Sequence, residues 1–139
     1  ENYIKIQLPA ISQNESVARN TIASFILDLS PTVEELNDVK TAVSEAVTNS
    51  VVHAYDDGGI VYIYAEIEQN TLSITVTDYG KGINDVEKAK EPFFTTKPDE
   101  ERSGMGFTIM ESFMDQLKVR SGQGRGTVVT MRRKIRSKR

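Results

Sequence analysis

Two runs of β-branched residues, separated by only three polar residues, constrain the fold of this chain more than any other feature. The runs cover residues 60–67 and 71–77, and Glu68, Gln69 and Asn70 join them. β-branched side chains favour extended backbone, and so short a connection brings the second strand back beside the first. The sequence therefore predicts an antiparallel β-hairpin near the middle of the chain.

Apolar spacing predicts the elements on either side of this hairpin. Thr32 followed by Glu35 forms a capping-box pattern, which predicts the start of a helix. In chain order we expect a strand over 3–8, helices over 12–29 and 32–54, the hairpin, a helix over 107–117, and strands over 119–121 and 127–135. We expect the second helix to be buried through Val33, Leu36, Val43, Ala46, Val47 and Val51.

The order of these elements predicts the fold class. Helices and strands do not alternate strictly, as they would around a parallel sheet. We therefore expect an α+β fold, a two-layer sandwich with helices on one face of a mixed, mainly antiparallel sheet. A length of 139 residues fits a single domain over 1–139.

Composition and charge exclude several kinds of site. The chain has no cysteine, so it forms no disulfide, thiolate metal site or cysteine nucleophile. No apolar run is long enough to cross a bilayer, and we expect a soluble, cytoplasmic protein without a membrane contact. Residues 132–139 carry six basic side chains, whereas the first 131 residues carry 11 basic and 20 acidic ones, a net charge of −9. We interpret this basic tail as a solvated terminus and expect no direct contact with nucleic acid.

Three polar residues follow one stripe of the second predicted helix. Glu45, Asn49 and His53 are spaced four residues apart, which places them on one helical face. Taken alone, such a stripe is more typical of a solvent-exposed face than of a functional site. The segments downstream change that balance.

Two glycine-containing segments lie downstream of that helix. Asp78-Tyr79-Gly80-Lys81-Gly82 directly follows the hairpin, so a carboxylate stands at a strand end beside glycines that allow a ligand to approach the backbone. Ser103-Gly104-Met105-Gly106 enters the helix expected from Phe107, where backbone N–H groups can receive phosphate oxygens. Each segment alone is weak evidence for a ligand site, and the first could be a plain turn. The second lacks the dinucleotide pattern, because Ile109 occupies the third glycine position. The aperiodic stretch between them predicts a functional loop or lid.

In combination and in this order, the motifs resemble those of the ATPase and kinase family that includes DNA gyrase B, the Hsp90 chaperones, histidine kinases and MutL. Glu45 to Asn49, with His53, resembles the asparagine box of that family, and Asp78 to Gly82 resembles its first glycine box. Pro92 to Lys97 resembles the start of the ATP lid, and Gly104 to Gly106 resembles the second glycine box. Gly126-Thr127 resembles the final strand motif. The resemblance implies the Bergerat type of ATP-binding fold.

The resemblance also implies a site for ATP, or ADP, with magnesium. Asn49 would bind Mg²⁺ through its amide oxygen. Asp78 would accept a hydrogen bond from the adenine amino group, with Thr127 holding the carboxylate or a water. Guanine presents an acceptor at that edge and would leave Asp78 unpaired. The other nucleotide contacts implied are Gly80, Gly82, Thr95, Thr96, Lys97, Arg102, Ser103, Gly104, Met105, Gly106 and Phe107.

Charged residues of these motifs are the candidates for phosphate chemistry. Arg102 is the candidate contact of the γ-phosphate, and Lys97 would neutralise phosphate charge. As alternatives, Lys97 could be only a solvated loop charge, and Arg102 could form an ion pair in the lid with Glu100 or Glu101. Glu45 lies one turn before Asn49 and is the expected general base. His53 is interpreted as a hydrogen-bonding residue at the helix end rather than a catalytic one.

Three stretches, 14–19, 43–49 and above all 101–115, are similar to the anti-sigma serine kinases of sporulating bacteria. The similarity implies a homodimer that holds a sporulation sigma factor inactive and phosphorylates a serine on an anti-anti-sigma partner. Arg19 is a candidate partner contact, although an ordinary exposed arginine fits equally well, and the strand over 3–8 is a candidate dimer seam. The alternatives are a nucleotide-gated binding module with little or no catalysis and an ATPase fragment of a larger machine.

Overall fold

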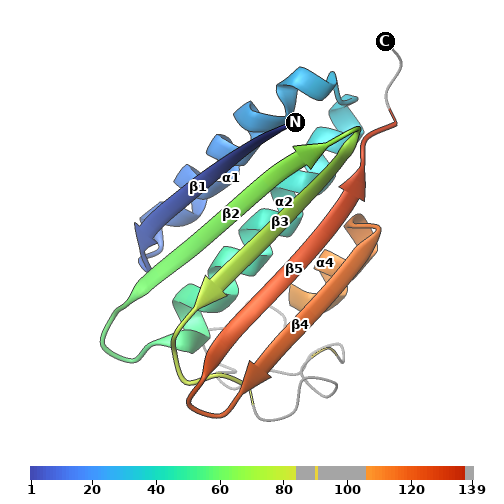
Figure 1. Ribbon diagram of the computed structural model, residues 1–139. Helices are drawn as coiled ribbons and strands as arrows, with labels where there is room; N and C mark the ends of the chain where they lie inside the picture. Colours follow the sequence, from blue (N-terminus) through green and yellow to red (C-terminus); the bar gives the residue numbers. More distant parts are fainter. Residues whose placement is uncertain (84–89, 91–105, 137–139) are drawn as a thin grey trace.

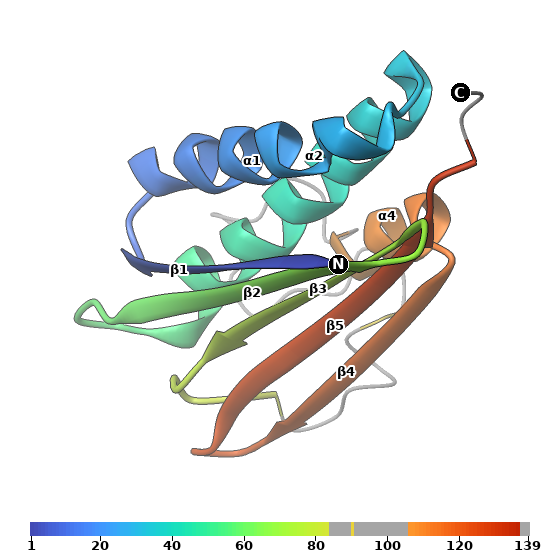
Figure 2. The same ribbon diagram turned by 45° about the horizontal axis from the view of Figure 1, so that its top comes forward.

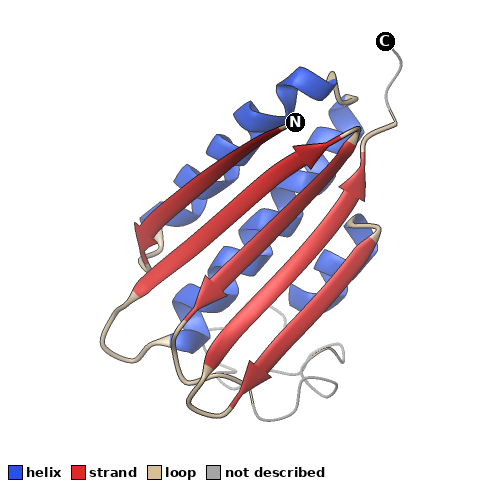
Figure 3. Ribbon diagram, viewed as in Figure 1, coloured by secondary structure: helices blue, strands red, loops and turns tan. Residues whose placement is uncertain are grey.

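The computed structural model describes residues 1–83, 90 and 106–136, which form two layers (Figure 1). One layer is a five-stranded sheet in the order β1, β2, β3, β5, β4. Its strands are β1 (Asn2–Pro9), β2 (Ile60–Glu68), β3 (Thr71–Asp78), β4 (Gln116–Gly122) and β5 (Gly126–Lys134). The other layer contains the helices α1 (Gln13–Phe25), α2 (Val33–Asn49) and α4 (Gly106–Phe113), which cover one face of the sheet (Figure 2, Figure 3).

The predicted α+β two-layer sandwich is confirmed, with helices on one face of the sheet. We expected a mixed, mainly antiparallel sheet, and every pairing between the described strands is antiparallel. The helical connection between β1 and β2 explains why these two strands pair antiparallel at the β1 edge of the sheet. α1 and α2 run in opposite directions (Figure 1), so the chain re-enters the sheet at the end where β1 stopped.

The inward faces of the strands form the core against the helices. On β3, Leu72, Ile74 and Val76 are buried, and the two-residue period of a strand turns Asp78 toward the same side. On β5 the same period buries Thr127 together with Val129 and Met131. Two polar side chains therefore lie on the helix-covered face, at the end of the sheet where β3 stops and β5 begins.

α2 begins at the predicted capping box, with Thr32 as its N-cap residue. Its apolar buried side chains are Val39, Ala42, Val43, Ala46 and Val47. Val33, which we expected to be buried, is 75% exposed, because this first residue of the helix is out of phase with that stripe. Helical backbone continues to Ala54 as expected, but the last segment is a π-helix, η2 (Ser50–Ala54).

Two helices end earlier than expected. The helix expected over 12–29 ends as α1 at Phe25 and continues as a short 3₁₀-helix, η1 (Ile26–Leu29). The helix expected to reach Leu117 ends as α4 at Phe113. The reason is that the Asp115 N–H donates to the Arg132 carbonyl (2.8 Å), so pairing with β5 begins there.

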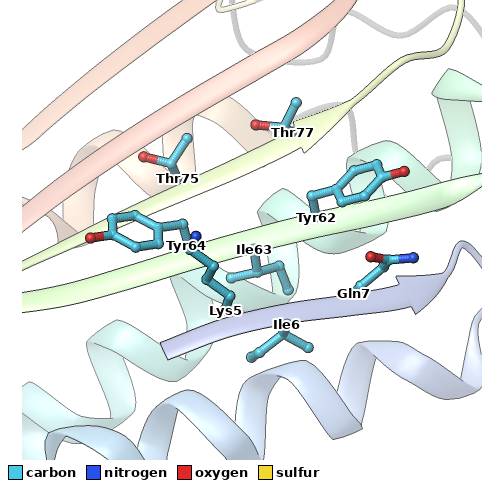
Figure 4. Close-up of a pocket in the computed structure, with 8 residues that line it drawn as sticks. All are labelled: Lys5, Ile6, Gln7, Tyr62, Ile63, Tyr64, Thr75 and Thr77. Atoms are coloured by element: carbon cyan, nitrogen blue, oxygen red, sulfur yellow. The ribbon is translucent and has the colours of Figure 1, made fainter. Parts of the chain in front are cut away.

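The face of the sheet opposite the helices is open within the described part of the chain. Tyr62 and Tyr64 on β2 and Thr75 and Thr77 on β3 line a shallow hollow of about 300 Å³ there, together with Lys5, Ile6, Gln7 and Ile63 (Figure 4). Asp78 and Thr127 face the other side, so this hollow is separate from them. No helix of the described chain is long and apolar enough to cross a membrane.

Glu35 fastens the end of the sheet to the start of α2. Its Oε1 accepts the Thr32 N–H (2.9 Å) and its Oε2 accepts the Arg136 N–H (2.7 Å). The Thr32 hydroxyl accepts the Glu35 N–H in return (3.0 Å). Burial acts to raise the pKa of Glu35, but the hydrogen bonds from Thr32 and Arg136 outweigh it and hold the pKa below its ordinary value.

Replacing Glu35 with alanine should lower the free energy of unfolding by about 2–3 kcal/mol, because two backbone N–H groups lose their acceptor. Thr32→Ala, which removes only the cap bond, should cost about 1 kcal/mol. Urea unfolding at neutral pH measures both, and equal costs would contradict the role of the Arg136 contact. Since the folded-state pKa of Glu35 is lowered, its stabilisation is present above the ordinary pKa of glutamate and is lost as the pH falls through the lowered value.

Candidate functional site

Asp78 is a buried carboxylate at the end of β3, only 4% exposed. Its Oδ2 accepts a hydrogen bond from the Ser50 hydroxyl (2.9 Å), and its Oδ1 accepts the Gly80 N–H (3.0 Å). The backbone N–H of Thr127, its partner in the β3–β5 register, helps to hold this carboxylate in its charged form. A carboxylate has about four acceptor positions, so the bonds from Ser50 and Gly80 leave acceptor positions for a ligand.

The charge of Asp78 is set by two opposing effects. Burial raises the pKa of Asp78 above its ordinary value, and the hydrogen bonds from Gly80, Ser50 and Thr127 oppose that rise. A carboxylate whose pKa is raised by desolvation while hydrogen bonds hold it in place is typical of binding and catalytic sites. Asp78 is therefore the centre of the candidate site.

The π-helix η2 brings the end of the helical layer against Asp78. Its first residue, Ser50, donates to Asp78, and at its other end the Ala54 carbonyl accepts the Lys81 N–H (2.9 Å). A π-helix bonds residues five apart, so the four-residue spacing that aligns Glu45 with Asn49 does not align Asn49 with His53. The predicted stripe thus divides: Glu45 and Asn49 lie in α2, and His53 lies in η2.

Glycines allow three backbone segments to meet beside Asp78. A Cβ at Gly80 would overlap with the Ala54 carbonyl, and one at Gly126 would overlap with the carbonyl of Asp78 itself. Gly82 has a φ of 79° and lies against the Gly122 carbonyl with no room for a Cβ. These contacts require glycine, and they dock the turn after β3 onto both η2 and the β4–β5 hairpin.

Glu45 and Asn49 are half-buried on α2, which packs against α4. A Cβ built on Gly106, the first residue of α4, would lie 3.5 Å from Glu45 Oε1. The structure therefore places the Glu45 carboxylate beside the N-terminus of α4. The Phe107 side chain is 6% exposed and belongs to the core, so the backbone is the part of this residue that remains for a ligand.

Thr127 takes part in two separate contacts. Its backbone N–H, rather than its hydroxyl, donates to Asp78. Its hydroxyl lies 2.9 Å from the Ser121 hydroxyl on β4. That the Thr127 side chain holds the carboxylate or a water stays a prediction.

Several predicted site residues are not part of this geometry. Arg19 lies on α1, where its guanidinium is 2.6 Å from Glu15 Oε2 and 3.4 Å from the Ser44 hydroxyl. The Ser44 hydroxyl also donates to Glu15 Oε2. The following predicted contacts lie outside the described residues: Thr95, Thr96, Lys97, Arg102, Ser103, Gly104 and Met105.

The described residues fit a magnesium ion bound together with phosphates. No three His, Cys, Asp or Glu side chains in ranges 1–83 and 106–136 gather closely enough to hold a metal ion by themselves. Mg²⁺ at nucleotide sites instead uses one or two protein oxygens together with water and substrate phosphates. The amide oxygen of the half-buried Asn49 is a ligand of that type.

Reasoning from the sequence missed two serines of the site. Ser50 occupies a position of the buried stripe of α2, three residues after Val47, and a polar side chain there was a usable signal. Ser121 lies in a short strand with no distinguishing pattern. Its contact with Thr127 depends on the β4–β5 register.

The chain matches the family model of the histidine kinase-like ATPase domain over residues 8–133. Relatives named anti-sigma F factor include one from Clostridium acetobutylicum, 56% identical over 97% of this chain and 95% of the relative. Another, from Anoxybacillus flavithermus, is 53% identical over 94% of this chain and 90% of the relative.

Two solved structures share the fold at 16% sequence identity. The RsbU and RsbW domains from Mycobacterium tuberculosis match with a TM-score of 0.70, over 97% of this chain and 32% of that one. The mycobacterial sensor histidine kinase MprB matches with a TM-score of 0.59, over 97% of this chain and 100% of that one. These two structures support the fold, and the family model and the relatives of 53–56% identity give the assignment: the chain belongs to the histidine kinase-like ATPase domain family and, within it, to the anti-sigma F factors.

Proposed function

We propose that this chain binds Mg-ATP, holds a sporulation sigma factor inactive and phosphorylates a serine on an anti-anti-sigma partner. The observation that carries the proposal is the buried Asp78 carboxylate, held by the Ser50 hydroxyl and the Gly80 N–H with acceptor positions left for a ligand. Membership in the anti-sigma F factors supports the sigma factor as a partner, since the relatives carry that name. The anti-anti-sigma partner is part of the proposal. We further propose a single cytoplasmic domain that dimerises through the edge strand β1, which pairs with β2 on one side.

The acceptor left at Asp78 favours adenine over guanine. The adenine amino group donates a hydrogen bond to the carboxylate, whereas guanine places a carbonyl oxygen at the same edge. An unpaired acceptor at this buried position costs about 1–3 kcal/mol. Gly80 and Gly82 let the nucleotide approach the turn backbone.

The phosphates extend from the adenine position toward Asn49 and α4. Asn49 binds Mg²⁺ through its amide oxygen, and the ion neutralises phosphate charge when bound. The N-terminus of α4 at Gly106 and Phe107 offers backbone N–H groups. The remaining proposed contacts to the nucleotide are Thr95, Thr96, Lys97, Arg102, Ser103, Gly104 and Met105.

Glu45 is the proposed general base. Its carboxylate lies beside the first residue of α4, where the terminal phosphate is proposed to bind. As the serine oxygen of the partner bonds to the terminal phosphorus, Glu45 takes the hydroxyl proton, and the bond from phosphorus to the oxygen of ADP breaks. The partner hydroxyl has to reach Glu45 for this step.

Glu45→Gln should lower phosphate transfer from labelled ATP to the anti-anti-sigma partner by roughly 10²–10⁴-fold while ATP still binds, because the amide cannot accept the proton. Glu34→Gln, an exposed residue of the same helix, is the matched control and should leave transfer unchanged. Full transfer by the Glu45 variant would contradict its role. Absence of transfer by the unaltered protein, with sigma binding still responding to ATP against ADP, would favour a nucleotide-gated binding module.

Ser50→Ala should shift the pH dependence of ATP binding upward. The raised pKa of Asp78 means that the acceptor is lost by protonation at a higher pH than for an ordinary aspartate, and removing the Ser50 hydrogen bond raises that pKa further. Calorimetric titrations from neutral pH downward measure the midpoint at which binding is lost. Because ATP titrates identically with both proteins, the difference in midpoint reports Asp78, and equal midpoints would refute the coupling.

Arg19 is the proposed contact for a protein partner. Glu15 holds its guanidinium on the surface of α1, so little side-chain freedom is lost when a partner binds. An arginine held in this way is a typical anchor of protein interfaces.

Arg19→Ala should weaken binding of the sporulation sigma factor about tenfold or more, with ATP affinity unchanged. Lys118→Ala, an exposed basic residue on β4, is the control for loss of one positive charge. Biolayer interferometry in the presence of ATP compares the three proteins. Unchanged sigma binding by the Arg19 variant would contradict the proposed partner contact and would indicate that Arg19 is an ordinary surface arginine.

A further inference from the structure

Ser121 lies where three segments of the candidate site meet. Its hydroxyl accepts the Ile83 N–H (2.7 Å) from the chain that follows the first glycine turn. The same hydroxyl donates to the Gly126 carbonyl (2.8 Å) and lies 2.9 Å from the Thr127 hydroxyl. One small side chain on β4 thus joins the turn after β3 to the start of β5.

The number of hydrogens at this junction fixes which group donates. A serine hydroxyl has one hydrogen and two acceptor positions. The Gly126 carbonyl can only accept and the Ile83 N–H can only donate, so the single hydrogen of Ser121 goes to Gly126. Its second acceptor position then receives the hydrogen of Thr127. The Thr127 hydroxyl is left with its lone pairs as an acceptor toward the rest of the site.

The position of Thr127 connects this hydrogen-bond arrangement to the nucleotide base proposed to bind at Asp78. Thr127 pairs with Asp78 in the β3–β5 register, and both side chains lie on the helix-covered face. Two acceptors, the Asp78 carboxylate and the Thr127 oxygen, are therefore neighbours. The adenine amino group carries two hydrogens, one for each acceptor, whereas guanine has at the same ring position a carbonyl oxygen, which donates to neither.

We propose that Ser121 is a positioning residue for nucleotide choice: it takes the hydrogen of Thr127 and so turns Thr127 into a second acceptor that favours adenine over guanine nucleotides. The inference rests on the proposed ATP site at Asp78. The backbone around it supports the same role, because the Lys81 carbonyl accepts the Gly124 N–H (2.6 Å) and keeps the turn against the β4–β5 hairpin.

The test compares the affinities for ATP and GTP by isothermal titration calorimetry of the full chain. In Ser121→Ala the Thr127 hydroxyl can turn and donate to guanine, so the ratio of the GTP Kd to the ATP Kd should fall about tenfold. Ser121→Thr keeps the hydroxyl and should restore the ratio. Ser112→Ala, which removes an exposed hydroxyl bonded to the Thr108 carbonyl within α4, is the matched control and should leave it unchanged.

A double-mutant cycle separates positioning from general support of the fold. In a Thr127→Val background the Ser121→Ala change should no longer alter the ratio, because the hydroxyl through which it acts is gone. A ratio unchanged in Ser121→Ala, or a loss of equal size for both nucleotides, would overturn the inference and leave ATP binding standing. Failure of the unaltered protein to bind ATP would overturn the proposed function and the inference with it. Ser121→Cys, a weaker hydrogen-bond partner of similar size, gives the same comparison if the alanine variant does not fold.

Discussion

Direct contact between backbone segments at one end of the sheet is the constraint on which the candidate site depends. Gly80 lies against the Ala54 carbonyl, Gly82 against the Gly122 carbonyl, and Gly126 against the carbonyl of Asp78. A side chain at Gly80 would push the turn after β3 away from η2, and one at Gly82 or Gly126 would push the β4–β5 hairpin away from β3 and that turn. Separation from η2 would also weaken the bond from Ser50 to Asp78. Because these glycines have no Cβ, the backbone segments come into direct contact. Together they hold the Asp78 carboxylate, which no single element could hold.

The fold followed from local patterns where those patterns are strong. The β-branched runs predicted both strands of the central hairpin to within a residue at each end, and Thr32 with Glu35 predicted the start of α2. The errors lie where tertiary contacts override local preference. α4 stops at Phe113 because Asp115 begins pairing with β5, a partner that the local sequence does not contain. Val33 was assigned to the core from its apolar character, although its helical phase turns it outward.

Apart from Ser50 and Ser121, the described residues of the candidate site were predictable from the sequence, but the contacts between them were not. Asp78, Asn49 and the glycines belong to recognisable motifs, and the order of those motifs in the chain indicated the resemblance to the ATPase and kinase family. The bond between Ser50 and Asp78 joins residues 28 positions apart, and the bond between Ser121 and Ile83 spans 38 positions. Such contacts follow from the register of the sheet and from the wider turn of η2. They decide which donors and acceptors remain for a ligand, and motifs alone do not specify that.

The direction of the strands has a practical consequence for how the molecule is handled. β3 runs toward the end of the sheet that carries Asp78 and the glycine turns, whereas β1 starts and β5 finishes at the opposite end (Figure 1). There Glu35 holds the backbone of Arg136 close to the start of α2. A fluorophore or a surface tether attached at the beginning of β1 or after β5 would therefore sit away from the glycine turns. Immobilised or labelled protein would leave the end of the sheet that carries Asp78 accessible to small ligands.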